Sequence, residues 1–118
     1  MTAPITLNVG GVPFCTSRQT LEALGGAHFF GGLVRALGDG TESTALFIDR
    51  DPTHFRHVLN HLRGSTTAPA TADGIEQLIA EADFYALELL KKELEDRLRA
   101  VRTDEIARQL GIIAAKLG

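Results

Sequence analysis

The chain has 118 residues and a mass of 12.7 kDa, which fits one domain with one core rather than two independently folding units. Hydrophobic residues make up 44% and charged residues 23% of the chain, which excludes the disordered class of low hydrophobicity and high charge. Twelve basic residues face 15 acidic residues, and the net charge of −3 excludes the basic excess that nucleic-acid binding requires.

Three further features bear on the compartment of the protein. The longest apolar runs, such as Ile112–Ala115, are far shorter than the ~20 residues that cross a bilayer, so we expect no direct membrane insertion. The N-terminus has no basic region leading into an apolar segment, and Cys15 is the only cysteine. These features predict a reducing, cytoplasmic location.

The first element predicted along the chain is a β-hairpin. Two runs of alternating apolar residues, 5–9 and 12–16, flank a turn of two glycines. In this register Asn8 faces Pro13, whose missing N–H must point away from the first strand. The second strand is therefore predicted to be a sheet edge, and a third strand must join on the other side of residues 5–9. The other predicted pairs are Ile5 with Thr16, Leu7 with Phe14, and Val9 with Val12.

Short elements are predicted next. Residues 17–24 predict a helix with Ser17 as its N-cap and Gly25 at its end. Residues 25–44 are predicted to be mostly loop because glycine is frequent there, with one short inward-facing helix around residues 29–37. Residues 45–48 are a compact apolar strand candidate.

The best helix signal follows that strand. Asp51 is a favoured N-cap, Pro52 suits the first helical position, and Gly64 ends the element after Arg63. Apolar residues between them have the i, i+3, i+4, i+7 spacing of one buried stripe. They are Phe55, Val58, Leu59 and Leu62.

Three further segments complete the chain after a surface loop predicted at residues 64–74. Asp73 and Glu76 resemble a capping box at the start of a helix. Another helix is predicted from about Ala86, and an amphipathic segment after Arg102. The apolar rows of the three segments are Ile75, Leu78, Ile79 and Ala82; then Leu87, Leu90, Leu94, Leu98 and Val101; and finally Ile106, Leu110, Ile113 and Leu117.

A histidine row, His54, His57 and His61, lies at i, i+3 and i+7 opposite the apolar stripe. Zinc needs four ligands, and neither a cysteine nor a paired carboxylate supplies the others nearby, so a polar packing face is favoured over a metal site. We expect no metal and no cofactor. If these histidines lie at a subunit contact, lowering the pH from about 7.5 to 5.5 is expected to loosen the assembly.

No catalytic constellation is predicted. Asp49 and Asp51 bracket Arg50 in a loop, where nothing separates the pKa values of two carboxylates as general acid and base catalysis requires. Instead, we expect Asp51 to cap a helix, and Asp49 and Arg50 to pair locally or across an interface. Cys15 is predicted to be a packing residue on the face opposite Phe14. The glycine-rich pieces lack the spacing of phosphate-binding loops.

Several motifs, from about residue 5 to residue 98, agree in order and approximate spacing with one known pattern. The motifs are Leu7-Asn-Val-Gly-Gly11, Phe14-x-Thr16, Thr20-Leu21, Phe47-Ile-Asp-Arg-Asp-Pro52, Phe55, Val58-Leu-Asn60, Leu62-Arg63-Gly64 and Glu81-Ala-Asp-Phe-Tyr85 followed by Leu87 and Leu90. With these motifs the sequence resembles the potassium channel tetramerisation branch of the BTB/POZ family, most closely the soluble KCTD proteins.

This resemblance implies an α/β BTB/POZ fold in which a hairpin and one further strand form a small sheet flanked by helices. It places the domain at residues 1–98, followed by an amphipathic helical tail at residues 99–118. It also implies a ring of identical subunits, four in channel domains and often five in soluble relatives. The expected interface residues are Asp49, Arg50 and Asp51, with Arg18, Asn60 and Arg63 as weaker candidates. The histidine and cysteine cluster of zinc-bearing members is missing from this sequence.

The function implied is that of a non-enzymatic, homo-oligomerising interaction module. By the same resemblance we expect a KCTD-type adaptor that recruits a cullin scaffold and a substrate protein for ubiquitin ligation. The alternatives are a cytosolic tetramerisation or auxiliary domain of potassium channels, and a pure scaffold. A small metal-dependent enzyme is the least favoured alternative, since it would require the histidine row to bind metal.

Overall fold

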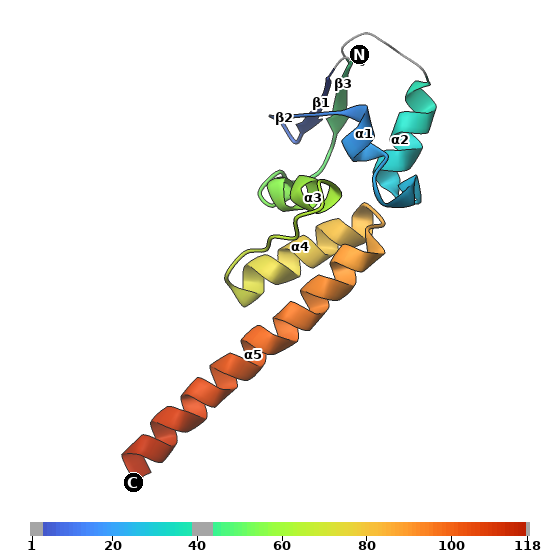
Figure 1. Ribbon diagram of the computed structural model, residues 1–118. Coiled ribbons are helices and arrows are strands. Elements are labelled where there is room, and N and C mark those ends of the chain that lie inside the picture. Colours follow the sequence, from blue (N-terminus) through green and yellow to red (C-terminus); the bar gives the residue numbers. More distant parts are fainter. Residues whose placement is uncertain (1–3, 39–43, 118) are drawn as a thin grey trace.

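A computed structural model describes residues 4–38 and 44–117, with side chains placed up to Gly111. One small sheet and a set of helices share a single core, and the last helix runs away from it (Figure 1). The order of elements is β1 (Ile5–Val9), β2 (Val12–Thr16), α1 (Arg18–Leu21), the 3-10 turn η1 (Leu24–Gly26), α2 (Phe29–Leu37), β3 (Thr44–Ile48), α3 (Phe55–Leu62), α4 (Ala72–Phe84) and α5 (Glu88–Leu117).

The sheet has the order β2-β1-β3, with β2 antiparallel and β3 parallel to β1. Asn8 pairs with Pro13, and every predicted hairpin pair is present, so the predicted register and the edge position of β2 are confirmed. Gly10 and Gly11 form the turn at positive φ, where glycine has no steric cost. A Cβ on Gly10 would lie 2.5 Å from the Arg50 carbonyl oxygen, so this turn packs closely against the loop after β3.

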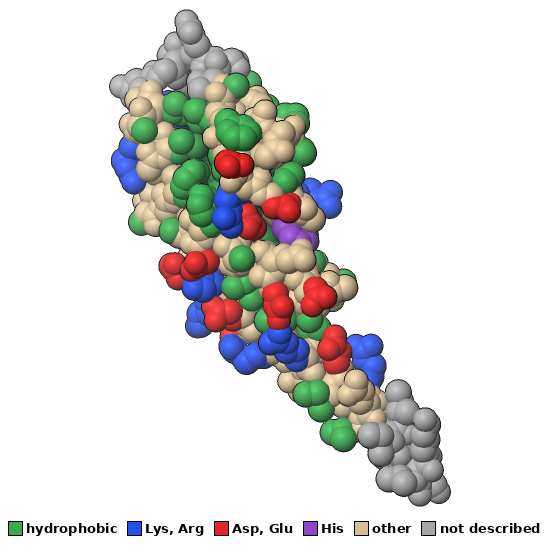
Figure 2. All heavy atoms as spheres, turned by 180° about the vertical axis from the view of Figure 1, so that it is seen from behind, with side chains coloured by type: hydrophobic (Ala, Val, Ile, Leu, Met, Phe, Trp, Pro, Cys, Tyr) green, Lys and Arg blue, Asp and Glu red, His purple; other side chains and the backbone are tan. Residues whose placement is uncertain are grey.

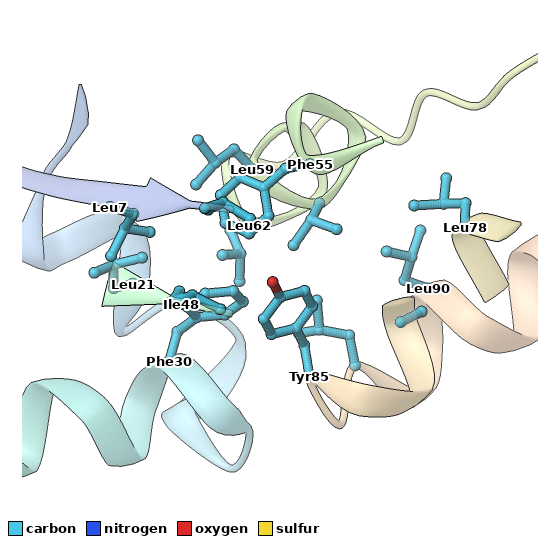
Figure 3. Close-up of a cluster of buried hydrophobic side chains, with 14 of the residues drawn as sticks. Leu7, Leu21, Phe30, Ile48, Phe55, Leu59, Leu62, Leu78, Tyr85 and Leu90 are labelled. Carbon is cyan, nitrogen blue, oxygen red and sulfur yellow. The ribbon is translucent and has the colours of Figure 1, made fainter. Parts of the chain in front are cut away.

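Aromatic rings fill the centre of the core (Figure 3). The Tyr85 ring stacks on Phe30 with 4.7 Å between centroids and meets Phe55 at 5.6 Å. Phe55 also contacts Phe14 of β2 at 4.8 Å. All four rings come from different elements, so the core joins the hairpin, α2, α3 and the end of α4. The apolar stripe predicted for α3 is buried, as are Ile75, Leu78 and Ala82 of α4.

The helix predicted at residues 17–24 is shorter than expected. Ser17 is the N-cap, since its Oγ accepts a hydrogen bond from the Thr20 amide at 3.1 Å, but α1 ends at Leu21. Leu24 and Gly25 have φ of 61° and 79°, which an α-helix cannot contain, so the chain forms η1 instead. The helix predicted around residues 29–37 is present as α2.

The predicted starts of α3 and α4 are wrong. The Asp51 carboxylate accepts hydrogen bonds from Thr53 in a tight turn, and α3 begins only at Phe55, with His54 in the N-cap position. α4 begins at Ala72 because Thr71, not Asp73, caps it through a 3.1 Å bond from the Gly74 amide. Thr71 thus satisfies a free amide at the start of α4, whereas no side chain caps the start of α3.

α5 is one continuous helix of 30 residues, where two successive segments were predicted. Its first half packs on α4, with Leu90, Leu94 and Leu98 buried, and Leu87 just before the helix is buried as well. Its second half extends beyond the domain and gives the molecule its length of 69 Å (Figure 1). None of the described helices combines the length and the hydrophobicity of a membrane-spanning helix.

Candidate functional site

The loop after β3 carries the central arginine of the predicted interface. Arg50 binds Glu81 of α4 in a bidentate ion pair, with Nε at 3.0 Å from Oε1 and Nη2 at 2.6 Å from Oε2. Its guanidinium carbon lies 4.2 Å from the centroid of the Phe84 ring. The hydrogen bond to Glu81 holds the pKa of Arg50 above its ordinary value. Arg50, Glu81 and Phe84 are called the Arg50 cluster below.

The two aspartates beside Arg50 differ in their bonding. Asp49 is exposed. Asp51 is also exposed and accepts the Thr53 amide at 2.8 Å and the Thr53 hydroxyl, and these bonds lower the pKa of the Asp51 carboxyl. The loop and Glu81 together carry three carboxylates and one guanidinium, of which only the Glu81 carboxylate contacts Arg50, so this surface has an excess of negative charge.

A polar cavity of about 190 Å³ opens next to this cluster. His54 lines it, and its Nε2 lies 2.8 Å from Oε1 of Gln77 on α4. Polar groups of α3 and α4 thus meet on the same side as the acidic loop. The full lining is Asp51, Thr53, His54, Gln77, Ala80 and Glu81.

The other three predicted interface residues lie elsewhere. Arg18 donates to the Gly38 carbonyl at the end of α2, and Arg63 donates to the Cys15 carbonyl of β2 at 3.3 Å. The Asn60 amide donates to the Thr67 hydroxyl at 3.0 Å. The structure therefore brings Asp49, Arg50 and Asp51 together but does not bring these three to them.

Glu81 and Phe84 were not predicted as site residues, although both lie in the motif that supports the family resemblance. Their i, i+3 spacing puts them on one face of α4, but only the tertiary contact with the loop after β3 gives them a partner. Phe47 was missed as well, and its side chain on β3 is 66% exposed. An exposed aromatic residue on an edge strand is typical of a contact surface.

A second hollow, an apolar groove of about 350 Å³, lies between η1 and the start of α5. Leu24 and Leu89 on its rim are 52% and 55% exposed. Leu24 and Ala86, both lining residues, have positive φ values of 61° and 57°, a strained conformation for residues with a Cβ. The remaining lining residues are Ala27, His28, His61, Leu87 and Glu88.

The histidine row does not form one polar face as predicted. His61 is buried at 5% exposure, because position i+3 from Val58 places it beside the apolar stripe. Its Nδ1 lies 3.3 Å from the Thr66 hydroxyl, while its Nε2 has no hydrogen-bond partner among the described residues. Burial lowers the pKa of His61 and of His57, whose Nδ1 lies 2.7 Å from the Thr67 hydroxyl.

The histidines therefore bond to three different residues of the chain. Within residues 4–38 and 44–111, no group of three histidine, cysteine, aspartate or glutamate side chains has the geometry to hold a metal ion. Cys15 is exposed on β2, so the prediction that it is a packing residue is wrong. Its side chain is on the face of β2 opposite to Phe14, as the hairpin register requires, but that face is open to solvent.

Comparison with known proteins agrees with this architecture. A family model for the BTB/POZ domain matches residues 5–94. SH3KBP1-binding protein 1 of Rattus norvegicus is 44% identical over 79% of this chain and 13% of its own length. FH protein interacting protein FIP2 of Arabidopsis thaliana is 34% identical over 86% of this chain and 35% of its own length.

A third relative is BTB/POZ domain-containing protein KCTD5 of Homo sapiens, which is 38% identical over 80% of this chain and 42% of its own length. The chain thus spans less than half the length of each of these relatives. The matched region contains the whole sheet, the core and the Arg50 cluster. This chain belongs to the BTB/POZ domain family, in its potassium channel tetramerisation branch.

Proposed function

We propose that this BTB/POZ domain is a non-enzymatic module whose copies pack side by side in a closed ring of four or five. The observation that carries the proposal is the Arg50 cluster with its flanking aspartates. Bidentate pairing and the Phe84 ring fix the guanidinium, so the loop presents an ordered polar surface rather than mobile side chains. An ordered polar surface loses little conformational entropy when it binds.

The charges of the domain suit a contact between two different surfaces. The loop at residues 49–51 has excess negative charge, whereas Arg18 and Arg63 lie near the ends of α2 and β2. An acidic surface on one copy and a basic surface on the next form a heterologous contact, the kind that closes into a ring. In this proposal Asp49 and Asp51 face Arg63 and Arg18 of the neighbouring copy.

The mass of the protein in solution tests the ring. Native mass spectrometry and sedimentation at 1 to 100 µM are expected to give four or five times the 12.7 kDa chain mass. Asp49→Arg and Arg63→Asp are each expected to weaken the assembly, and the double variant to restore it. Asp96→Arg, a charge reversal on the exposed side of α5, is the matched control. A single chain at every concentration would refute the ring.

Within this role, the chain recruits a cullin scaffold as a KCTD-type adaptor. The support is the 38% identity to KCTD5 and the apolar groove, which offers a protein partner the exposed side chains of Leu24 and Leu89. Two relatives are themselves named for protein partners, SH3KBP1 and an FH protein.

A pull-down with purified cullin tests this role. Binding at micromolar concentration, lost in Leu89→Asp but kept in Glu95→Asp, supports it. The control residue lies on the exposed face of the same helix. No binding by a wild-type chain that still forms the ring would leave a pure scaffold, or, in a ring of four, a domain that assembles channel subunits.

A further inference from the structure

The second half of α5 has no covering element within the described chain. α4 runs antiparallel to α5, as the ion pairs of Asp83 with Lys91 and of Glu76 with Arg102 show. Because α4 begins at Ala72, it covers α5 only as far as about Arg102. From Thr103 to Gly111 every residue of α5 is exposed. In Figure 1 the helix extends away from the other elements here.

Two large apolar side chains lie on this uncovered part. Ile106 is 57% exposed and Leu110 is 60% exposed. Figure 2 shows hydrophobic side chains on the helix just before its undescribed end, while charged side chains of both signs alternate above them. Neighbouring exposed apolar side chains at i, i+4 form a continuous strip on a helix.

This strip does not continue the face that packs on α4. The domain-facing row runs through Leu94, Leu98 and Val101, and its next positions are the charged residues Glu105 and Arg108. The apolar residues instead shift by one position, to Ile106 and Leu110. The apolar face of the tail is therefore available to a binding partner other than α4 of the same chain.

The spacing of the tail is that of a coiled coil. Ile106 and Leu110 occupy heptad positions d and a, and Ile113 and Leu117 continue this spacing in the sequence, although their side chains lie outside the described part. Leucine at a combined with isoleucine at d favours three or four strands over two. The choice of residues thus points to an assembly larger than a dimer.

The charges of the tail identify a copy of itself as the partner. Within residues 103–117, positions a, d and e hold no charged residue; Ala107 and Ala114 occupy both e positions, and the one charge at g, Lys116, has no e position of the segment to face. Asp104, Glu105 and Arg108 all fall on the outer positions b, c and f. A parallel copy would therefore meet no like charge across the contact.

We propose that residues 103–117 bind the same segment of three other copies as a parallel four-stranded coiled coil along the ring axis. The inference rests on the proposed ring and selects four subunits for it. A helix of roughly two heptads, about 22 Å long, is marginal alone. Attached to a ring, the tails share a high effective concentration, so a weak contact suffices.

Two full-length variants with the same new side chain test the contact. Leu110→Glu is expected to raise the concentration at which the oligomer dissociates by about tenfold, because it places four like charges at one a layer. Arg108→Glu, on the outer face, is expected to leave that concentration within about twofold of wild type. Equal dissociation of the two variants would refute the proposal.

Cross-linking tests the parallel register. In a Cys15→Ser background, Leu110→Cys is expected to form disulfides between copies on mild oxidation, whereas Arg108→Cys is not. Absence of the Leu110→Cys cross-link, or a ring of five, would overturn the coiled coil while leaving the proposed ring intact. A wild-type chain that stays single at every concentration would instead overturn the proposed function.

Discussion

Breaking the ion pair between Arg50 and Glu81 is expected to destabilise the domain by more than an ordinary surface pair would. The two side chains are 30% and 12% exposed, so the pair lies between the fully exposed and the buried classes of ion pair. Exposed pairs are worth about 0.2 to 1 kcal/mol, whereas removing one partner of a buried pair costs about 3 to 5 kcal/mol. Two charge-assisted hydrogen bonds hold it. We expect a coupling free energy of about 1.5 to 2 kcal/mol.

A double-mutant cycle isolates the coupling free energy between Arg50 and Glu81. Arg50→Met, Glu81→Gln and the double variant are compared by urea unfolding at one fixed chain concentration, because the proposed assembly would make stability depend on concentration. Arg50→Met also loses the contact with Phe84, worth about 0.5 to 1 kcal/mol, but that loss cancels in the cycle.

The pair of Arg99 and Asp96 on α5 serves as the control. Both side chains are more than half exposed, so the same cycle there is expected to give less than about 0.5 kcal/mol. A coupling between Arg50 and Glu81 no larger than that of the control would refute the argument that the cluster is a fixed, preorganised surface.

Three further outcomes are expected from the core. Tyr85→Phe should leave stability unchanged or raise it by about 1 kcal/mol in thermal unfolding, because the buried hydroxyl has no partner among the described residues. Gly31→Ala should cost about 3 kcal/mol in urea unfolding, since its Cβ would lie 1.9 Å from the Gly26 carbonyl oxygen. The pKa values of His57 and His61 are lowered in the folded chain, so the unfolded chain binds protons more readily. The free energy of unfolding should therefore fall as the pH drops below about 6.5 and stay level above it. A flat profile of this free energy between pH 7.5 and 5.5 would contradict the argument.

The sheet was predictable because local chemistry decides it. Two adjacent glycines fix the turn, and the alternation on either side then permits one register. Pro13 excludes a neighbour on its own side, which puts the third strand beside residues 5–9. The buried rows of α3 and α4 follow from apolar periodicity in the same way.

Features that depend on contacts distant in sequence were not predictable. The role of Glu81 requires α4 to lie against the loop after β3, a contact between residues 31 positions apart. His61 was assigned to a polar face because histidine counts as polar in a periodicity argument, yet its ring is buried against Thr66. The starts of α3 and α4 were missed because several residues near each start have a side-chain oxygen that can accept an amide. Asp51 was expected to cap α3 but binds Thr53 in a turn, whereas Thr71 caps α4 and was overlooked.

The polar cavity and the apolar groove are both lined by a histidine in or next to α3 and by residues in or just after α4. α3 places His54 in the polar cavity and His61 in the apolar groove, two turns or about 10 Å apart. α4 contributes Glu81 to the first, and the chain immediately after it contributes Ala86 to the second. Tyr85 lies between these positions in the centre of the core. A substitution that moves α3 is therefore expected to alter both surfaces, so tests of the proposed ring and of the proposed partner binding belong together in every variant.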